Sequence, residues 1–483
     1  MNTQNSSLHG EWSSRLGFIL AATGSAVGLG NIWKFPYVTG EYGGGAFVLV
    51  YLLCIFLICM PVMMAEVMLG RRGRHSPINT MRRLAQETQK SSSWQLLGWM
   101  GVIAGFLILS YYSVIAGWAL AYVARLASGV FASVNTLPAD QVSTYVTGIF
   151  NSLISDPERL LLWHTVFMVV TVLMVAGGVQ GGLERAVRFM MPALFLLLLV
   201  LVGYAMSTNN FLQGLHFLFD FDFQKLIYPN CETTAQDCTF SSQGILAAVG
   251  QAFFTLSLGM GSIMVYGAYL PRHASIAKTT AVVVVADTTI ALLAGMVIFP
   301  IVFSNGLTPG QGPGLVFNTL PIAFGKMPGG SFFGSLFFVL LVLAAWSSAI
   351  SLIEPAAAWL VETGRFSRIS AAIVCGFTAW LVGLATVFSF NIWQHVKPLA
   401  MIAQFEDKTL FDLLDFLTSN IMLPLGGLLI AIFVAWLMKS SSVAEELDTT
   451  VNKPSYRLWY FLLRYLTPLG IGLVFLNAIG VIS

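Results

Sequence analysis

The sequence predicts an all-α membrane protein that crosses the bilayer many times. Of its 483 residues, 57% are hydrophobic and only 10% are charged, whereas about 25% of residues are charged in an ordinary soluble domain. Apolar runs of about 20 residues recur along the chain, and each is long enough to cross about 30 Å of hydrocarbon. The net charge of +2 is too small to indicate binding to nucleic acid. We therefore expect one domain over residues 1–483 in a lipid bilayer, with its oligomeric state open.

Eleven apolar segments are predicted to be transmembrane helices. They cover residues 15–37, 45–70, 96–125, 159–178, 186–206, 243–269, 277–303, 332–361, 369–390, 413–438 and 456–481. Glycines interrupt the first and the sixth, over residues 24–31 and 257–261. Glycine weakens a helix, and unwound backbone at membrane depth is tolerated only inside protein or beside a polar cavity. A flexible or closely packed helix explains one such segment equally well, but two of them favour unwinding.

The two broken segments open two successive blocks of five spans. Because five is odd, the second block is inverted relative to the first, which is typical of an inverted-repeat transporter with its binding site at the midplane. We expect the first repeat over residues 14–206, the second over 242–438, and an additional helix over 456–481. This expectation rests on position and glycine interruption, since the two halves show no clear sequence identity.

Basic residues in alternate loops favour a cytoplasmic N-terminus. The densest group is Arg71, Arg72, Arg74, Arg82 and Arg83, between the second and third spans. Eleven spans then place the C-terminus outside, together with the loop that holds Cys231 and Cys238. An oxidising compartment would favour a disulfide between these two cysteines, with two free thiols as the alternative.

Polar side chains at membrane depth are costly and point to function. They are Ser25 and Asn31 in the first span, Glu66 in the second, Gln251, Thr255 and Ser257 in the sixth, Asp287, Thr288 and Thr289 in the seventh, and Ser347, Ser348, Ser351 and Glu354 in the eighth. A single hydroxyl commonly bonds to its own helix, but the group supplies neutral oxygens and a carboxylate that suit a small hard cation. No cluster of histidine and cysteine and no HExxH, GxSxG or Walker motif is present, so neither a transition-metal site nor an enzyme is indicated.

Five motifs carry a resemblance to a known family. They are WSSRLG from Trp12, GLGNIWKFPY from Gly28, EYGGGAF from Glu41, GQAFFTLSLG from Gly250 and FNTLP from Phe317. From Trp12 to the end of the last span, the chain resembles the neurotransmitter:sodium symporter family, in particular its bacterial amino-acid transporters. The resemblance implies the leucine-transporter fold in a bacterial inner membrane, and sodium-coupled symport of an amino acid by alternating access.

Two sodium sites follow from this resemblance, residue by residue. The first would use the Ala26 carbonyl, Asn31, Thr255, Asp287 and the carboxylate of the substrate. The second would use the carbonyls of Gly24, Val27 and Ala344 with the hydroxyls of Ser347 and Ser348. Half-helix ends and freed carbonyls suit a zwitterion and cations in this way.

The resemblance also implies an amino-acid site between the broken helices. The substrate carboxylate would meet the amides around Leu29 and Gly30 and the Tyr112 hydroxyl, and its amino group would meet the carbonyls of Ala26, Phe254 and Thr255 and the Ser257 hydroxyl. The substrate side chain would lie against Ser25, Ile108, Phe254, Met260, Ser348 and Leu352. This apolar lining favours a neutral, hydrophobic L-amino acid. A sensor that binds without transport, and a symporter of a carboxylated osmolyte or β-amino acid, stay open as alternatives.

Gate positions carry over as well. Tyr112 and Phe254 would form the outer lid, with Lys34 and Asp415 outside it, although a lysine that snorkels is the alternative for Lys34. The inner gate would comprise His9, Trp12, Tyr269 and Glu362.

The chain departs from the family pattern at several positions. Gly28 stands where monoamine transporters carry an aspartate, which favours a substrate with its own carboxylate. Lys34 replaces an arginine and cannot pair bidentately, while His9 replaces an arginine of the inner gate. A histidine there would make inner closure pH-sensitive; an inward-open population unchanged between about pH 6 and 8 would count against this hypothesis. Asp287 replaces an asparagine and Ala291 a serine, so we expect sodium coupling without chloride, since a fixed carboxylate can stand in for the anion.

Overall fold

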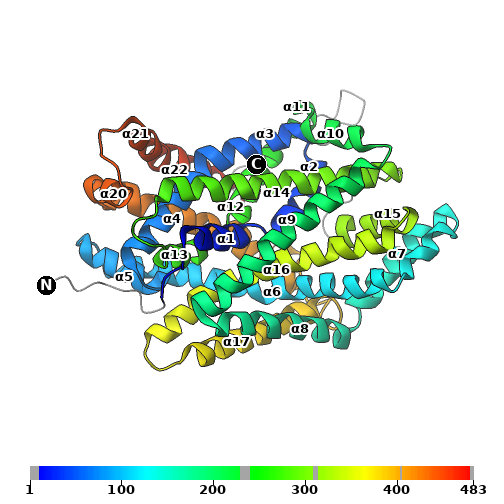
Figure 1. The fold of residues 1–483 in the computed structure, drawn as a ribbon, viewed down its shortest axis with the longest axis horizontal. Helices are drawn as coiled ribbons and strands as arrows, with labels where there is room; N and C mark the ends of the chain where they lie inside the picture. The colour runs from blue at the N-terminus through cyan, green and yellow to red at the C-terminus, as the bar shows by residue number, and fades with distance from the viewer. Residues whose placement is uncertain (1–9, 229–239, 308–313, 403–404, 479–483) are drawn as a thin grey trace.

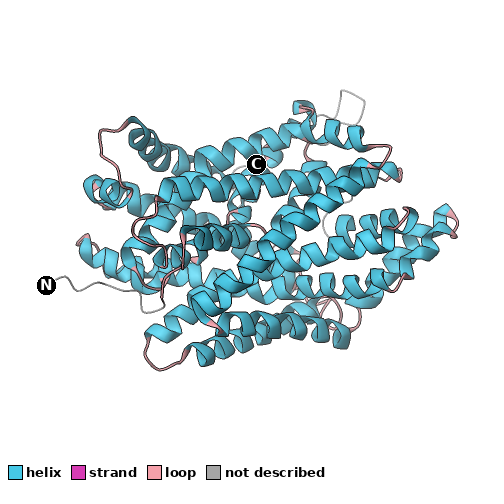
Figure 2. Cartoon of the chain, viewed as in Figure 1, coloured by secondary structure: helices cyan, strands magenta, loops and turns pink. Residues whose placement is uncertain are grey.

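Long apolar helices run side by side along the molecule (Figures 1 and 2). The computed structural model describes residues 10–228, 240–307, 314–402 and 405–478. The predictions for His9, Cys231 and Cys238 therefore lie outside the described residues. Within these ranges the ordered secondary structure consists of helices, as expected for an all-α membrane protein.

Several spans are assembled from more than one helical piece, and short π-helical pieces are labelled η, as are the 3₁₀ helices η3 and η4. In chain order the spans are α1 (Arg15–Ala26), η1 (Gly30–Lys34) and α2 (Phe35–Glu41); α3 (Gly45–Cys54), η2 (Ile55–Cys59) and α4 (Met60–Gly73); α6 (Gln95–Ala127); α8 (Pro157–Ala176); η5 (Val179–Glu184) and α9 (Arg185–Met206); α12 (Gln243–Thr255) and α13 (Ser262–Ala268); α14 (Ile276–Ser304); α16 (Gly330–Glu362); α17 (Arg368–Ser389); α18 (Leu410–Asp415), η8 (Phe416–Met422), α19 (Leu423–Ile432) and η9 (Phe433–Leu437); and α21 (Pro454–Phe461), η10 (Leu462–Leu466) and α22 (Thr467–Ala478). The loop helices are α5 (Pro77–Glu87), η3 (Ser92–Trp94), η4 (Val130–Asn135), α7 (Ala139–Ile154), α10 (Phe211–Phe219), α11 (Phe223–Ile227), η6 (Leu315–Thr319), α15 (Leu320–Lys326) and α20 (Ser440–Glu446).

The number of spans is consistent with the eleven that the sequence predicts. Nine continuous helices are long and apolar enough to cross a membrane, and a pair bent by 49°, Arg15–Ala26 with Gly30–Glu41, makes ten among the described residues. The remaining predicted span is the pair α12 and α13, which is interrupted over residues 256–261. Positive φ angles at Ser257 (54°), Gly259 (79°) and Gly261 (74°) break this helix, because such angles cannot be part of a right-handed helix.

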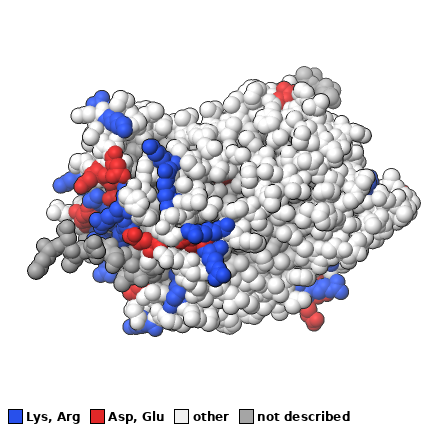
Figure 3. Space-filling view, in the orientation of Figure 1, with Lys and Arg blue, Asp and Glu red and all other residues white. Residues whose placement is uncertain are grey.

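The surface is that of a protein in a bilayer. Charged side chains gather at the left end of the view, near α5 and α20, and the wide middle is almost bare of them (Figure 3). Large apolar side chains are exposed along the spans, with Leu173 67% and Phe189 72% exposed. Contact of such side chains with lipid hydrocarbon costs no free energy, whereas their contact with water would be unfavourable.

The two broken spans lie at the centre of the bundle. Helix α1 packs against α9, α14 and α16, and α13 packs against α4 and α16. Helices α4 and α13 approach closely at Gly70, where a Cβ atom would stand 1.9 Å from the Met264 carbonyl oxygen. The surrounding continuous helices therefore hold the unwound segments in place.

Candidate functional site

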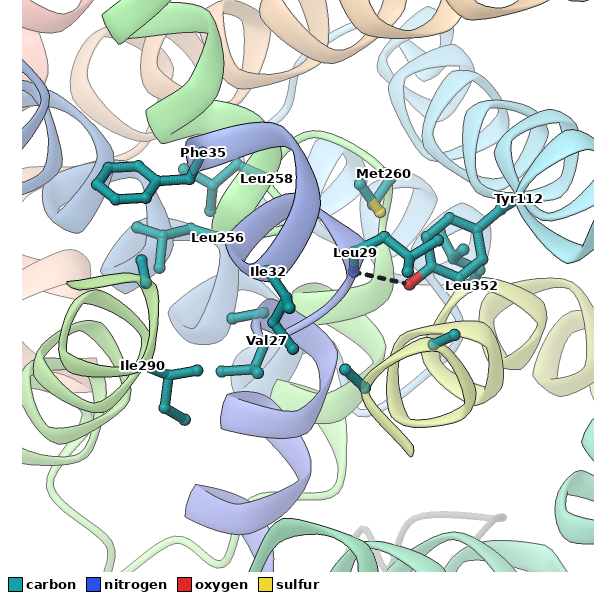
Figure 4. Close-up of a cluster of buried hydrophobic side chains, with 14 of the residues drawn as sticks. Val27, Leu29, Ile32, Phe35, Tyr112, Leu256, Leu258, Met260, Ile290 and Leu352 are labelled. Atoms are coloured by element: carbon teal, nitrogen blue, oxygen red, sulfur yellow. Dashed lines mark hydrogen bonds between the residues drawn. The ribbon is translucent and has the colours of Figure 1, made fainter. Parts of the chain in front are cut away.

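The first break exposes backbone groups inside the protein. Helix α1 ends at Ala26, Val27 takes an extended conformation, and the helical conformation resumes with η1 at Gly30. The freed N–H of Gly28 donates to the Asn31 side-chain oxygen at 3.0 Å, and that of Leu29 donates to the Tyr112 hydroxyl at 3.2 Å (Figure 4). Such unpaired backbone needs polar partners at membrane depth, and here side chains and neighbouring helices provide them.

A cavity of about 30 Å³ lies between the two breaks. Its lining comprises Ser25, Ala26, Gly28, Leu29, Gly30, Ile108, Tyr112, Phe254, Ser257, Met260, Ser348 and Leu352. The structure thus brings together every predicted substrate residue except Thr255, which faces Asp287 instead. Several of the apolar side chains appear in Figure 4, where Met260, Tyr112 and Leu352 lie on one side of Leu29.

Gly28 also lines this cavity, although it was not among the predicted substrate residues. A Cβ atom there would stand 2.5 Å from the Ser348 hydroxyl oxygen and 3.0 Å from the Tyr112 hydroxyl oxygen. Any side chain at this position would therefore enter the cavity. The sequence held a signal for this role, because Gly28 stands where monoamine transporters carry an aspartate.

The residues proposed for the first sodium site converge from three spans. The Asn31 amide nitrogen donates to Asp287 Oδ1 at 2.8 Å, and the Thr255 hydroxyl donates to Asp287 Oδ2 at 3.1 Å. All three side chains are buried. Carboxylate, amide and hydroxyl oxygens are the ligands that a small hard cation prefers, so this group is suited to hold one.

The residues proposed for the second sodium site also come together. The Ser347 hydroxyl lies 2.9 Å from the Ala344 carbonyl oxygen and 3.4 Å from that of Val27. The Ser348 hydroxyl lies 3.3 Å from the Val27 oxygen and 3.5 Å from the Gly24 oxygen. The two hydroxyls of α16 thus lie within 3.5 Å of carbonyl oxygens at the C-terminal end of α1 and in the first break. Oxygen donors of this kind are the ligands that small hard cations prefer.

Three polar residues that the sequence left without a role fasten the two breaks to their surroundings. Glu66 of α4 accepts a hydrogen bond from the Gly259 N–H at 3.1 Å, and Gln251 donates to the Gly30 carbonyl at 2.9 Å. Ser351 accepts one from the Ser25 hydroxyl at 2.8 Å. Their burial at membrane depth was the signal, but the partners became apparent only in three dimensions.

The outer gate residues lie above the cavity without forming an ion pair. Lys34 and Asp415 line a second cavity of about 80 Å³, together with Tyr112 and Phe254. The Lys34 ammonium lies 4.6 Å from the centre of the Phe254 ring. Asp415 accepts hydrogen bonds from Ser419 at 2.9 Å and from Tyr111 at 3.3 Å. No contact within 4.0 Å joins Lys34 to Asp415 in the described part of the chain.

Trp12, predicted for the inner gate, packs against α13 and the residue that follows it. Its backbone N–H donates to the Tyr269 carbonyl at 3.0 Å, and its indole N–H donates to the Tyr266 carbonyl at 3.1 Å. The ring packs edge-on against both tyrosines. The Tyr269 hydroxyl donates to Glu354 at 2.8 Å, and Glu354 pairs with Arg368 of α17. Aromatic packing and a buried ion pair therefore join the start of α1 to α13, α16 and α17.

Glu362, the fourth predicted inner gate residue, contacts the start of α5. Its carboxylate accepts hydrogen bonds from the Ser76 N–H at 2.6 Å and the Asn79 amide at 2.5 Å. These contacts join the end of α16 to the start of α5.

Comparisons with known proteins agree with this geometry. A sequence profile of the sodium:neurotransmitter symporter family matches residues 9–133 and 150–483. The sodium-dependent transporter YhdH of Bacillus subtilis (strain 168) is 39% identical over 475 residues, which cover 98% of each chain. A sodium-dependent transporter of Haemophilus influenzae is 32% identical over 479 residues, covering 98% of this chain and 99% of the relative. The crystal structure of MhsT in complex with L-phenylalanine is similar with a TM-score of 0.84 and 42% identity, covering 97% of this chain and 99% of MhsT.

Proposed function

Because this chain belongs to the sodium:neurotransmitter symporter family, we propose that it carries a neutral, hydrophobic L-amino acid into the cell together with sodium. The chain is a multi-pass, sodium-coupled transporter of the leucine-transporter fold and not an enzyme. The finer proposal concerns its substrate, its ion sites and its direction of transport.

One observation carries the choice of substrate: the cavity between the breaks is lined by both polar and apolar groups. Leu29 N–H and the Tyr112 hydroxyl suit a carboxylate, while the Ser257 hydroxyl and the carbonyl of Ala26 suit an ammonium group. Ile108, Met260 and Leu352 offer only hydrocarbon and sulfur to the side chain. The similarity to MhsT, which was solved with L-phenylalanine, supports an apolar side chain.

A cavity of about 30 Å³ has room for about one water molecule, so an amino acid enters only if the lining moves apart. The contacts at Trp12 close one end of the pathway, and the lid of Tyr112 and Phe254 covers the other. Alternating access then requires these two ends to open in turn.

Sodium couples to substrate through the shared first break. Asn31 and Asp287 of the first ion site are in direct contact, and Gly28, between Asn31 and the cavity, is bonded to Asn31. Sodium there would order the same backbone that meets the substrate carboxylate, and this coupling is reciprocal. The carboxylate of Asp287 would make chloride unnecessary.

The orientation proposed from the loop charges places the end with Trp12, α5 and α20 in the cytoplasm. This end carries most of the Lys and Arg side chains visible in Figure 3, in keeping with the positive-inside rule.

A thermal-shift screen of the twenty amino acids tests the proposal. With sodium, leucine, phenylalanine and similar L-amino acids should raise the melting temperature, because a ligand that binds only the folded state stabilises it. The same compounds in potassium should give a much smaller shift. Equal shifts in both salts, or shifts from charged amino acids only, would contradict the proposed substrate and coupling.

A further inference from the structure

A groove of about 490 Å³ opens on the membrane-facing surface, away from the transport pathway. Its walls come from α4, from the beginning of α14, and from α21 with the loop before it. We call it the α4–α14–α21 groove. It lies toward the left end of Figure 1, where α20 and α21 lie, which is the end proposed to face the cytoplasm.

The floor of this groove is apolar and borders the lipid. Phe56, Met60 and Met64 line it from one side, and Leu458 and Leu462 line it from the other. Phe56 is 42% and Leu458 61% exposed, and both belong to segments long and apolar enough to span the bilayer. Hydrocarbon is therefore the medium that meets this floor.

The rim of the groove is positively charged. Lys278 and Lys453 line it, and neither forms an ion pair within 4.0 Å in the parts of the chain that the structure describes. The rim has one carboxylate, that of Asp448, and it lies 3.8 Å from Arg71 Nη2. Asp448 thus has Arg71 as a cationic neighbour, although Arg71 pairs more closely with Glu446 at 2.6 Å, whereas neither ammonium group has a carboxylate within 4.0 Å among the described residues.

Helix ends add to this positive potential. Helix α14 begins at Ile276 after its N-cap Ser275, and α21 begins at Pro454 after Lys453. The N-terminus of a helix carries a partial positive charge, and both ends lie at the rim. The Thr449 hydroxyl, also at the rim, is buried and has no hydrogen-bond partner.

We propose that the α4–α14–α21 groove binds an anionic phospholipid of the cytoplasmic leaflet. Lys278 and Lys453 hold the phosphate, and one acyl chain lies along Phe56, Met60 and Leu462. Basic pockets between membrane helices on the cytoplasmic side are suited to anionic headgroups, and this groove combines such a pocket with an apolar floor. The proposal concerns a site separate from the transport cavity and relies only on the proposed orientation.

Native mass spectrometry of the full chain in detergent tests this proposal. The probes are dioleoyl phosphatidylglycerol, dioleoyl phosphatidylcholine and inorganic phosphate. The wild type should retain phosphatidylglycerol at least about tenfold more strongly than phosphatidylcholine, since each lysine near the membrane surface favours an anionic lipid. Millimolar phosphate should not displace the lipid, because phosphate gains nothing from the apolar floor. Equal retention of both lipids, or displacement by phosphate alone, would overturn the assignment.

Variants locate the site. The double substitution K278Q/K453Q should lower retention of phosphatidylglycerol about tenfold, and A277F should lower it by filling the groove while both lysines remain. The matched control is K90Q/K439Q, which removes two exposed lysines of the same end that lie outside the groove. If the control lost as much lipid as K278Q/K453Q, or if K278Q/K453Q bound as the wild type does, the groove would not be the site. A lipid-free dimer of the wild type that A277F dissociates would instead assign the groove to a second copy of the chain.

Discussion

The side-chain amide of Asn31 donates a hydrogen bond of 2.8 Å to Oδ1 of Asp287. This contact joins the first broken span to the middle of α14, and Asn31 in turn holds the freed N–H of Gly28 at 3.0 Å. One buried carboxylate is thereby linked through a single side chain to the backbone that lines the cavity. Two hydrogen bonds of Asn31 therefore connect the proposed ion site to the proposed substrate site.

We expect Asp287→Ala to weaken sodium and substrate together. The substitution removes the charge proposed to hold the first sodium and leaves the Asn31 amide without its acceptor. Hydrogen bonds to charged groups contribute about 1.5–3 kcal/mol, so both affinities should fall roughly tenfold to a hundredfold. Sodium titrations of thermal stability, with and without amino acid, measure both. A loss in only one of the two affinities would separate the ion site from the substrate site.

Uptake should not require chloride, because the Asp287 carboxylate supplies the negative charge beside the proposed first sodium. Initial rates in chloride and in gluconate at equal sodium should agree. The informative variant is Asp287→Asn combined with Ala291→Ser, which removes the carboxylate and adds a hydroxyl. Its uptake should rise with chloride. A wild type whose uptake collapses in gluconate would refute the account of Asp287.

Tyr112→Phe should lower substrate affinity with little change in folding. The hydroxyl lies 3.2 Å from Leu29 N and is proposed to meet the substrate carboxylate, and one such hydrogen bond contributes about 0.5–1.5 kcal/mol. We expect affinity to fall about three- to tenfold. Tyr122→Phe is the matched control, since its hydroxyl bonds to the Phe317 carbonyl at 2.9 Å, away from the cavity. A control that lost affinity equally would show a general effect of losing a buried hydroxyl.

The double substitution of Ser347 and Ser348 by Ala should weaken sodium more than substrate. These hydroxyls lie within 3.5 Å of the carbonyls of Gly24 and Val27, so the variant removes two of the five oxygens of the proposed second site. Sodium affinity should fall at least about tenfold. Ser367→Ala with Ser370→Ala, an exposed pair at the start of α17, is the control. Unchanged sodium affinity in the Ser347 and Ser348 variant would remove this site from the account.

Trp12→Ala should loosen the end of α1. The substitution removes the indole hydrogen bond to Tyr266 and the packing on Tyr266 and Tyr269, and truncation of a buried aromatic costs about 3–5 kcal/mol. Amide hydrogen exchange over residues 15–26 should accelerate at least about tenfold. Trp99→Ala, which removes a ring packed on Trp359, should leave this segment unchanged. Protection of residues 15–26 equal to that of the wild type would show that Trp12 does not fasten α1.

Much of this architecture could be predicted from the sequence. Apolar length sets the span boundaries, and the glycines over residues 24–31 and 257–261 mark where the first and sixth helices break. The convergence of Ser347 and Ser348 with Gly24 and Val27 followed from a family resemblance, which encodes contacts between residues more than 300 positions apart. The repeat boundaries 14–206 and 242–438 stay a prediction.

Other features depend on packing that no local pattern reveals. In the sequence, Glu66 is only a polar residue in an apolar run. The approach of α4 to the sixth span in the structure shows that its carboxylate accepts a hydrogen bond from the Gly259 N–H. Lys34 and Asp415 have the right charges for an outer ion pair, yet Lys34 lies over the Phe254 ring and Asp415 bonds to Ser419. Charge alone does not specify a partner when an aromatic face and a hydroxyl are also within reach.

Uptake of labelled L-phenylalanine and L-leucine into proteoliposomes tests the central claim most directly. Under an inward sodium gradient, wild-type protein should accumulate at least one of them above its external concentration, and replacement of external sodium by potassium should abolish the accumulation. Asp287→Ala should accumulate far less at the same sodium concentration. Binding of these amino acids without accumulation, or equal accumulation in potassium, would contradict sodium-coupled symport at this site.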